Sequence, residues 1–502
     1  MDEVTDQQTA GSINQTKKTS WFGNIAKNPF IFGVALFSTL GGFLFGYDQG
    51  VVSGVLTMES FGAKFPRVYN DSGFKGWFVS TLLLAAWFGS LVNGPLADYI
   101  GRKMCVITAV VVFVIGSAIQ AGAVNIPMLF AGRAIAGFSV GQLTMVVPLY
   151  ISEVSLPDIR GGLVVLQQLS YWLDYGTNYI GGTQCAPGIP YTGGTVEKPV
   201  FDPYKDVGPN GCDGQSDASW RVPLAFQILP ALVLGVGTLF FPDSPRWLFM
   251  KDREEEGRQS LATLRRKPIN HPSIETEFLE IKASVILENT FAKEKFANMS
   301  GVKLHAAQYY SLLSTWSRFR RLAIGCSIMF FQQFMGCNAM IYYAPTVFKQ
   351  LGLDGNTSSL LATGVYGIIN CISTLPALFW IDRLGRRMLL MCGAAGTFIS
   401  LVIVGAIIGA YGSNFKAHAA AGWVGVVFIY LYDVNFSYSF GYLYYYVNHV
   451  DVQFTLEEMD SVFGDTEAHE EQKRIMQIEA SLRGTAIDDS DAVKAKVLEE
   501  SV

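Results

Sequence analysis

The stretch GGFLFGYDQGVVSG, Gly41–Gly54, places one carboxylate, Asp48, inside a glycine-rich apolar run. Apolar residues continue on both sides, so residues 30–54 have the length and composition of a membrane-spanning helix. An acid inside such a helix is energetically unfavourable and marks an ion or substrate pathway by default. The pattern therefore predicts a membrane protein in which Asp48 takes part in transport.

The composition agrees with a membrane protein. Of the 502 residues, 50% are hydrophobic and only 16% are charged, against about 25% charged in an ordinary soluble domain. The net charge of −5 gives no reason to expect a nucleic-acid partner. No Cys/His spacing fits a metal site, and no nucleophile–base set or phosphate loop is recognisable. We therefore expect no cofactor and no enzymatic activity.

Apolar runs long enough to cross a bilayer recur ten times along the chain. They lie at residues 30–54, 77–97, 104–122, 127–151, 162–183, 222–241, 321–346, 358–381, 387–411 and 420–446. A polar, charged segment with helical spacing separates the sixth run from the seventh. The expected organisation is a tail (1–29), a six-span half (30–241), a helical insert (242–320), a truncated second half (321–446) and a second tail (447–502).

Basic residues fix the predicted orientation, because cytoplasmic loops are enriched in Lys and Arg. They gather after the second, fourth and eighth runs and in the insert, so the insert and both tails are expected in the cytoplasm. Loop 182–220 is then outside. It contains Cys185 and Cys212, which either form a disulfide in the oxidising exterior or remain two free thiols. Asn70 and Asn356 begin acceptor sequons for glycosylation in predicted outer loops.

The two halves share a hairpin. The second run ends in GPLADYIGRK, Gly94–Lys103, and the eighth ends in IDRLGRR, Ile381–Arg387. Glycine permits the tight turn, and the basic pair can bind carboxylates or helix C-termini. Repeated six-span halves are typical of transporters whose substrate site lies between the halves near the midplane. A charged loop that only sets topology is the alternative reading.

These features resemble the sugar porter family of the major facilitator superfamily, most closely its fungal monosaccharide:proton symporters. The motifs that carry the resemblance are FGYD (Phe45–Asp48), GPLADYIGRK, GR (Gly132–Arg133), PLYISEVSLPDIRGG (Pro148–Gly162), QQL (Gln167–Leu169), WRVPLAFQILPA (Trp220–Ala231), PDSPRWL (Pro242–Leu248), QQFMGCNAMIYYAP (Gln332–Pro345), Asn370, DRLGRR (Asp382–Arg387) and FTLEEMD (Phe454–Asp460). The resemblance implies an all-α fold of two pseudo-symmetric helical halves, with about ten spans here instead of twelve.

Three departures from the family pattern stand out. About 65–70 family residues are missing between Ser439 and Phe454, which removes most of spans ten to twelve. Span five is short, because QQLS is followed directly by YWLDYG. The shortening places Asp174 deeper in the membrane than the outer end of the span, where the family has it. Asp243 stands where the family has Glu. The first two departures predict lost segments, and transcripts with in-frame coding sequence at both junctions would confirm this.

A sugar site needs amide and hydroxyl side chains, because sugars present many hydroxyls and no charge. Span seven carries such groups in one run, and a discontinuous or bent helix could point several of them at one cavity. The resemblance assigns sugar contacts to amide residues on spans five, seven and eight. With Tyr342 from the span-seven run, the predicted sugar site consists of Gln168, Gln332, Gln333, Asn338, Tyr342 and Asn370. The alternative is that these amides only bond helices together.

The resemblance pairs Asp48 with Arg133 for proton coupling. Burial in a low dielectric favours the neutral carboxyl, so such an acid can take up and release a proton near neutral pH. Protonation would weaken the ion pair and let the halves rock; a fixed structural pair is the alternative. The cytoplasmic gate is expected to contain the charged residues and hairpin glycine of the motifs, Asp98, Gly101, Arg102, Glu153, Arg160, Asp243, Arg246, Asp382, Arg386 and Arg387.

The sequence thus predicts a sugar transporter that couples uptake of a hexose or pentose to a proton by alternating access. Its expected partners are sugar, proton and the lipid bilayer, and we expect a monomer in the plasma membrane. A transporter of a disaccharide, polyol or related solute is the first alternative. An inactive truncated product or a sugar sensor is the second, since the partners of the second-half gate lie in the missing stretch.

Overall fold

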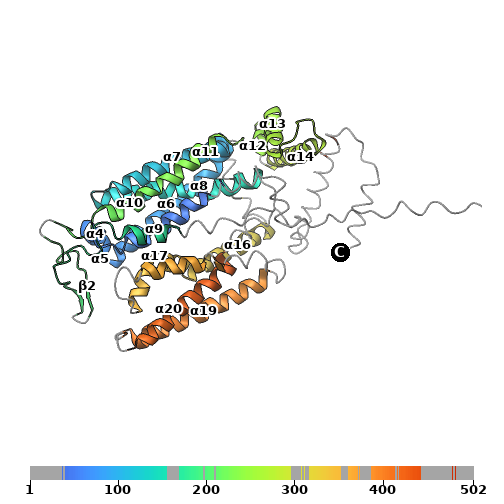
Figure 1. Cartoon of the computed structure of the whole chain (residues 1–502). Helices are drawn as coiled ribbons and strands as arrows, with labels where there is room; N and C mark the ends of the chain where they lie inside the picture. Colours follow the sequence, from blue (N-terminus) through green and yellow to red (C-terminus); the bar gives the residue numbers. More distant parts are fainter. Residues whose placement is uncertain are drawn as a thin grey trace, which may run out of the picture.

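The computed structural model describes residues 37, 40–154, 169–195, 198–208, 211–295, 307, 310, 316–351, 360–370, 372–373, 386–412, 415, 418–441, 478 and 481. Its helices form two groups that lie side by side, with a third, smaller group at one end (Figure 1). The first group comes from the N-terminal half of the chain and the second from the C-terminal half.

The first group runs from α3 to α11. Its members are α3 (Leu40–Val55), α4 (Glu59–Lys64), α5 (Pro66–Asn70), α6 (Ser72–Ile100), α7 (Arg102–Ala121), α8 (Ile126–Val154), α9 (Leu169–Thr177), α10 (Ala218–Phe226) and α11 (Ile228–Leu239). The longest, α6 and α8, pack against each other, and α8 also packs against α7. The second group contains α16 (Trp316–Phe334), α17 (Cys337–Gln350), the segment Leu360–Asn370, α19 (Arg386–Tyr411), α20 (Ala419–Phe436) and the π-helical turn η3 (Ser437–Gly441).

Seven helices among the described residues are long and apolar enough to cross a membrane, and each matches one of the ten predicted runs. The remaining three runs are described only in part. They contain α3, α9 and Leu360–Asn370, which are helical but shorter than a full span within the described residues. All ten runs therefore contain helix among their described residues.

Small residues let the first-half helices approach closely. A Cβ on Gly141 of α8 would stand 1.9 Å from the carbonyl oxygen of Ala86 on α6, and one on Gly89 would stand 2.0 Å from that of Phe138. Helices in membranes gain their association from such close packing rather than from hydrophobic burial. Glycine at these positions is what allows α6 and α8 to touch.

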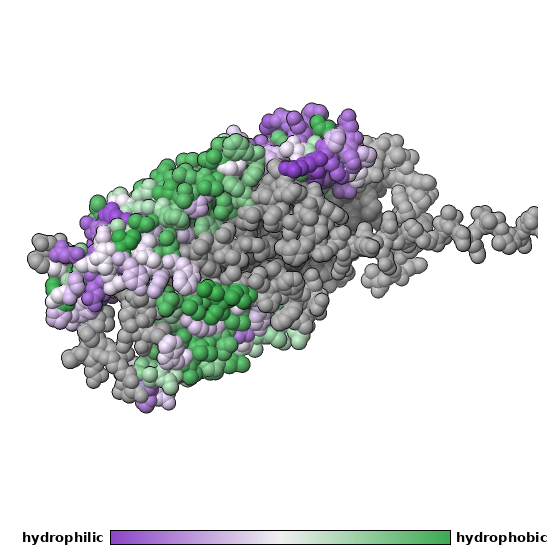
Figure 2. Space-filling view, viewed as in Figure 1, coloured by the Kyte–Doolittle hydropathy of each residue, from purple (hydrophilic) through white to green (hydrophobic). Residues whose placement is uncertain are grey.

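The outward faces of the long helices are apolar. Large exposed hydrophobic side chains cover them, including Trp87, Phe88, Leu91, Leu232, Val236, Phe398, Val402, Trp423 and Val427. Figure 2 shows hydrophobic surface over the middle of both helix groups and hydrophilic surface at the two ends of the molecule. This is the pattern of a protein whose sides contact lipid and whose ends contact water.

The helical insert forms the small third group. It contains α12 (Pro245–Met250), α13 (Glu254–Arg265) and α14 (Pro272–Lys295), which pack on one another around Phe249 and Phe278. The longest of them, α14, has 24 residues. Its charged faces are bound by ion pairs to α13, such as that between Arg258 and Glu275 at 2.6 Å.

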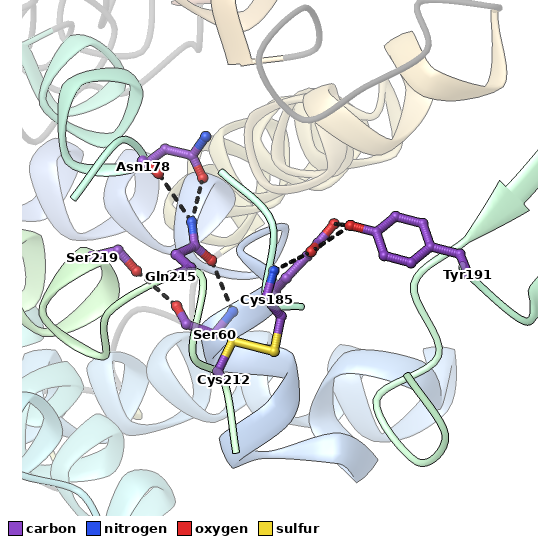
Figure 3. Close-up of a disulfide and its surroundings, with 8 residues drawn as sticks. Ser60, Asn178, Cys185, Tyr191, Cys212, Gln215 and Ser219 are labelled. Carbon is purple, nitrogen blue, oxygen red and sulfur yellow. Dashed lines mark hydrogen bonds between the residues drawn. A yellow bond between two sulfur atoms is a disulfide. The ribbon is translucent and has the colours of Figure 1, made fainter. Parts of the chain in front are cut away.

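The connection between α9 and α10 folds into a compact outer cap, defined here as residues 181–217. It contains a two-stranded antiparallel sheet, β1 (Gly193–Thr195) with β2 (Lys198–Val200), which the helical reading of the chain did not predict. The structure joins Cys185 and Cys212 in a disulfide within this cap (Figure 3). Of the two sequons, Asn70 lies exposed at the end of α5, and Asn356 lies outside the described residues.

Candidate functional site

Asp48 and Arg133 form an ion pair in the interior of the first half. The Arg133 Nη1 donates to Asp48 Oδ2 at 2.8 Å, and both side chains have no solvent exposure. The Arg133 guanidinium also lies over the ring of Phe78 at 5.2 Å from its centroid. Two buried charges in a membrane interior are tolerated because each compensates the other.

The second half contacts this ion pair through Tyr342. Helix α17 packs against α3, and Tyr342 is buried in the same apolar cluster as Tyr47 and Phe78. Its hydroxyl lies beside Gln49 and within electrostatic reach of Asp48 and Arg133. The buried pair therefore sits at the contact between the two halves, where a change in its charge can influence how they pack.

Span seven is broken at its polar run. Helix α16 ends at Phe334, Gly336 adopts a positive φ of 86°, and α17 begins at Cys337. On α20, Tyr432 donates its hydroxyl to the carbonyl of Met335 at 3.0 Å, which satisfies one carbonyl that the break releases. Discontinuous helices of this kind form substrate sites in transporters.

The predicted sugar-contact residues surround this break. Asn338 Nδ2 donates to Gln333 Oε1 at 2.6 Å, which joins two of them across the break. Gln332 is buried and donates to the carbonyl of Phe440 in η3 at 3.1 Å. Gln333 is exposed and Asn338 half-buried among the described residues. Span seven thus presents the Gln332 amide toward span ten, while Gln333 and Asn338 are bonded to each other across the break.

Asn370, at the end of the segment Leu360–Asn370, is bound to span ten. Its Nδ2 donates to Asp433 Oδ1 and to Ser437 Oγ, both at 2.8 Å. Asp433 is fully buried. The sequence reading missed Asp433, although an acid inside the run 420–446 is the same signal that pointed to Asp48.

On the predicted cytoplasmic side, Arg102 binds two carboxylates of the expected gate. Its guanidinium lies 2.9 Å from Glu153 on α8 and 3.1 Å from Asp98 on α6. The side chains of Arg102 and Glu153 are each 5% exposed. The hairpin therefore ties spans two, three and four together by buried charge.

Two further contacts explain the residues of the hairpin. Gly101 has a φ of +94°, and a Cβ there would lie 3.0 Å from the Trp247 ring. The Trp247 indole donates to the Asp98 carbonyl at 3.2 Å and so attaches α12 to the hairpin. Lys103 donates to the carbonyls of Leu239 and Phe241 at the C-terminal end of α11, where a cation is favoured. The basic pair thus binds carboxylates and a helix C-terminus, as its pattern indicates.

The structure describes the remaining predicted residues of the gate and the sugar site only in part. Asp243 accepts a hydrogen bond from Ser260 through its backbone carbonyl, and Arg246 lies in the first turn of α12. Arg386 and Arg387 begin α19, but their side chains lie outside the described residues. Gln168, Arg160 and Asp382 also lie outside them.

The outer cap is attached to the first half by buried hydrogen bonds. Glu59 on α4 accepts from the Cys185 amide at 2.8 Å and from the Tyr191 hydroxyl. Gln215 accepts from the Ser60 amide at 2.9 Å and donates to Asn178 (Figure 3). Glu59 was not predicted, because its partners lie 126 residues or more away along the chain.

Two acids, Glu59 on α4 beneath the cap and Asp206 within it, have pKa values shifted in opposite directions. Burial raises the pKa of Glu59 above its usual range, against the hydrogen bonds from Cys185 and Tyr191. Burial also opposes the charge of Asp206, but the hydrogen bonds from Thr192, Asp202 and Gly193 outweigh it and hold the pKa of Asp206 below its usual range. Folding therefore makes Glu59 harder to ionise and Asp206 easier to ionise than in the unfolded chain.

The model of the family described as "Sugar (and other) transporter" matches residues 34–449, most of the chain. The chain belongs to this sugar transporter family. It is a multi-pass membrane protein, and among its described residues no group of His, Cys, Asp and Glu is arranged to hold a metal ion.

Three similar proteins illustrate the relationship. The probable glucose transporter rco-3 of Neurospora crassa is 32% identical over 418 residues, which cover 81% of this chain and 63% of the relative. The human proton myo-inositol cotransporter is 32% identical over 375 residues, which cover 75% and 51%. The sugar transporter chain described here therefore spans well under two thirds of the length of these two relatives.

A solved structure has the same fold. The xylose transporter XylE from E. coli, in a partially occluded inward open conformation, superposes with a TM-score of 0.61 at 24% identity and covers 90% of this chain and 92% of that one. This likeness places the sugar transporter chain in the major facilitator fold of two helical halves.

Proposed function

We propose that this protein is a proton-coupled transporter that carries a monosaccharide, a hexose or a pentose, across the plasma membrane by alternating access. The observation that carries the proposal is the fully buried Asp48–Arg133 ion pair at the contact with Tyr342 of the second half. A carboxyl in this position can exchange its charge for a proton, and the energy of the pair changes when it does. This change in the energy of the ion pair acts at the contact between the two halves.

In this proposal the sugar binds at the break in span seven. Amides of Gln332, Gln333 and Asn338 offer the mixture of donors and acceptors that sugar hydroxyls require. Tyr342 adds an aromatic face, and Asn370 and Gln168 contribute from spans eight and five. The relatives whose names mention glucose and myo-inositol support a polyhydroxylated substrate.

The contacts between the two halves indicate which end of the transporter is closed. In the described residues, α17 packs on α3 at the end predicted to face outward, and the Tyr343 hydroxyl lies near Gly76 at the start of α6. A closed outer end corresponds to a site open to the cytoplasm. The charges around Arg102, with Arg160, Asp243, Arg246, Asp382, Arg386 and Arg387, would close the cytoplasmic end when the halves rock the other way.

Uptake of labelled D-glucose and D-xylose into cells that lack their own sugar transporters tests this function. Accumulation above the outside concentration, abolished by a protonophore, is the expected result. Entry that only equilibrates would mean facilitated diffusion, and no entry of any sugar would identify the chain as an inactive product or a sensor. A cyclic polyol is the second candidate substrate, favoured by the human relative, and competition by myo-inositol distinguishes it.

A further inference from the structure

Span ten contains a second carboxyl buried in the helical interior. Asp433 lies in the last turn of α20 with no solvent exposure, in a helix that is otherwise mostly apolar. Its neighbour Tyr432 contacts the break in span seven through the Met335 carbonyl. Asp433 therefore lies at the sugar-site side of the second half. Intramembrane acids of this kind are retained for ion or substrate handling.

The partners of Asp433 are neutral donors from the same site. Asn370 Nδ2 donates to its Oδ1 at 2.8 Å, and the Tyr366 hydroxyl also donates to the carboxyl. Ser437 Oγ lies 3.5 Å away and accepts the second Asn370 hydrogen at 2.8 Å. Both N–H groups of the Asn370 amide are therefore turned toward span ten.

The charge environment of Asp433 differs from that of Asp48. Asp48 faces Arg133 at 2.8 Å. The groups that act on Asp433 from the segment Leu360–Asn370 and from its own helix are Asn370, Tyr366, Ser437 and Tyr432, of which none is a cation. From span seven, Cys337 acts on Tyr432, the neighbour of Asp433. The described side chains of α19 include no charged group. An ionised Asp433 is held by hydrogen bonds alone.

We propose that Asp433 is a second proton-binding residue of the transport cycle, and that its carboxylate competes with the sugar for the same donors. The inference rests on the proposed transport function. When Asp433 is ionised, charge-assisted hydrogen bonds hold the Asn370 amide and the Tyr366 hydroxyl against it. When a proton from the outside water binds the carboxylate to give the neutral acid, these bonds weaken and the donors turn to sugar oxygens. Release of the proton to the cytoplasm restores the carboxylate and expels the sugar.

Glucose binding to the purified full-length chain at acidic and at neutral pH tests the competition. In the wild type, we expect glucose to bind about tenfold more tightly at acidic pH, the effect of about one charge-assisted hydrogen bond. Asp433→Asn removes the charge at every pH, so its affinity should be high and independent of pH. The exposed cap variant Asp213→Asn should keep the wild-type dependence.

Two results would overturn the inference. The first is that Asp433→Asn keeps the pH dependence of glucose binding seen in the wild type. The second is that Asp433→Asn weakens glucose binding equally at both pH values, which is what loss of a purely structural hydrogen bond would cause. If this variant does not fold, proton uptake on glucose binding is measured in Asp48→Asn by titration in buffers of different ionisation enthalpy. Uptake that persists supports a second site, and its absence overturns it. A wild type that binds no monosaccharide contradicts the proposed function itself, whereas coupled uptake with unaltered Asp433→Asn behaviour contradicts only this inference.

Discussion

Arg133 Nη1 lies 2.8 Å from Asp48 Oδ2, and neither side chain reaches solvent. The two residues are 85 positions apart, on α8 and α3, so the ion pair joins spans one and four. Breaking a buried pair from one side leaves an uncompensated charge, which is strongly unfavourable. In the proposed transport cycle, protonation of Asp48 would do this reversibly, and Tyr342, which lies within electrostatic reach of the pair, would pass the change to the second half.

The first prediction concerns Asp48→Asn. The amide keeps the shape of the carboxyl but cannot carry a proton across, so uphill accumulation of sugar should be abolished while exchange of labelled for unlabelled sugar is retained. Both are measured in transporter-null cells, with surface expression of each variant checked. Full accumulation by this variant would refute the coupling role of Asp48 and leave a fixed structural pair.

The second prediction concerns Arg102. Arg102→Ala leaves the buried Glu153 carboxylate without its cation, and we expect a loss of about 3 kcal/mol of stability together with reduced transport. Thermal unfolding of the purified protein measures it. Arg253→Ala is the matched control, because Arg253 pairs with Glu256 at an exposed position and should cause no measurable change. Equal melting temperatures for the two variants would show that the hairpin charges do not stabilise the fold.

Much of this site follows from sequence. The ten apolar runs and the basic hairpin depend on local patterns with a direct physical cause, whereas the pairing of Asp48 with Arg133, 85 positions apart, came from the family resemblance. The break in span seven agrees with the expectation of a bent helix, and Gly336 supplies the backbone freedom for it. These features are predictable because each depends on a few neighbouring residues or on a familiar motif.

Long-range partners were not predictable. Glu59 looks like an ordinary loop acid, and only the folded cap brings the Cys185 amide and Tyr191 to it. Asp433 carried a readable signal, an acid in an apolar run, but its significance depends on Asn370 from another span. The small sheet of the cap depends on pairing between three-residue strands, which are too short to show a periodic pattern.

The third prediction tests the close approach of α6 and α8. Gly141→Ala would bring a methyl group within 1.9 Å of the Ala86 carbonyl oxygen, so the helices must separate at a loss of about 3 kcal/mol. Gly405→Ala on α19 is the control, because no atom lies within 4 Å of the added methyl. Detergent-solubilised yield and melting temperature should fall for the first variant only. A normal melting temperature for Gly141→Ala would contradict this packing.

The fourth prediction concerns the pH dependence of the cap. Because the pKa of Glu59 is raised in the folded protein, the folded state binds the extra proton and its stabilisation is lost as pH rises from about 4.3 through the raised value. Asp206 has a lowered pKa, so its stabilisation is lost as pH falls below about 3.9. Hydrogen exchange corrected for intrinsic rates should show the Cys185 amide opening more readily as pH rises and the Thr192 amide opening more readily as pH falls.

Glu59→Gln provides the control for that experiment. The amide oxygen can still accept from the Cys185 amide but no longer titrates, so exchange at Cys185 should lose its pH dependence while exchange at Thr192 keeps it. Protection of the Cys185 amide that increases with pH in the wild type would show that the carboxylate, rather than the neutral acid, is the favoured form.

Proton movement accompanying sugar movement tests the central claim most directly. The purified protein is placed in sealed vesicles with a pH-sensitive dye inside, and D-glucose or D-xylose is added outside without any imposed gradient. The account predicts acidification of the vesicle interior that follows the entry of labelled sugar and that is absent with Asp48→Asn. Sugar entry in the wild type with no change in internal pH would contradict it.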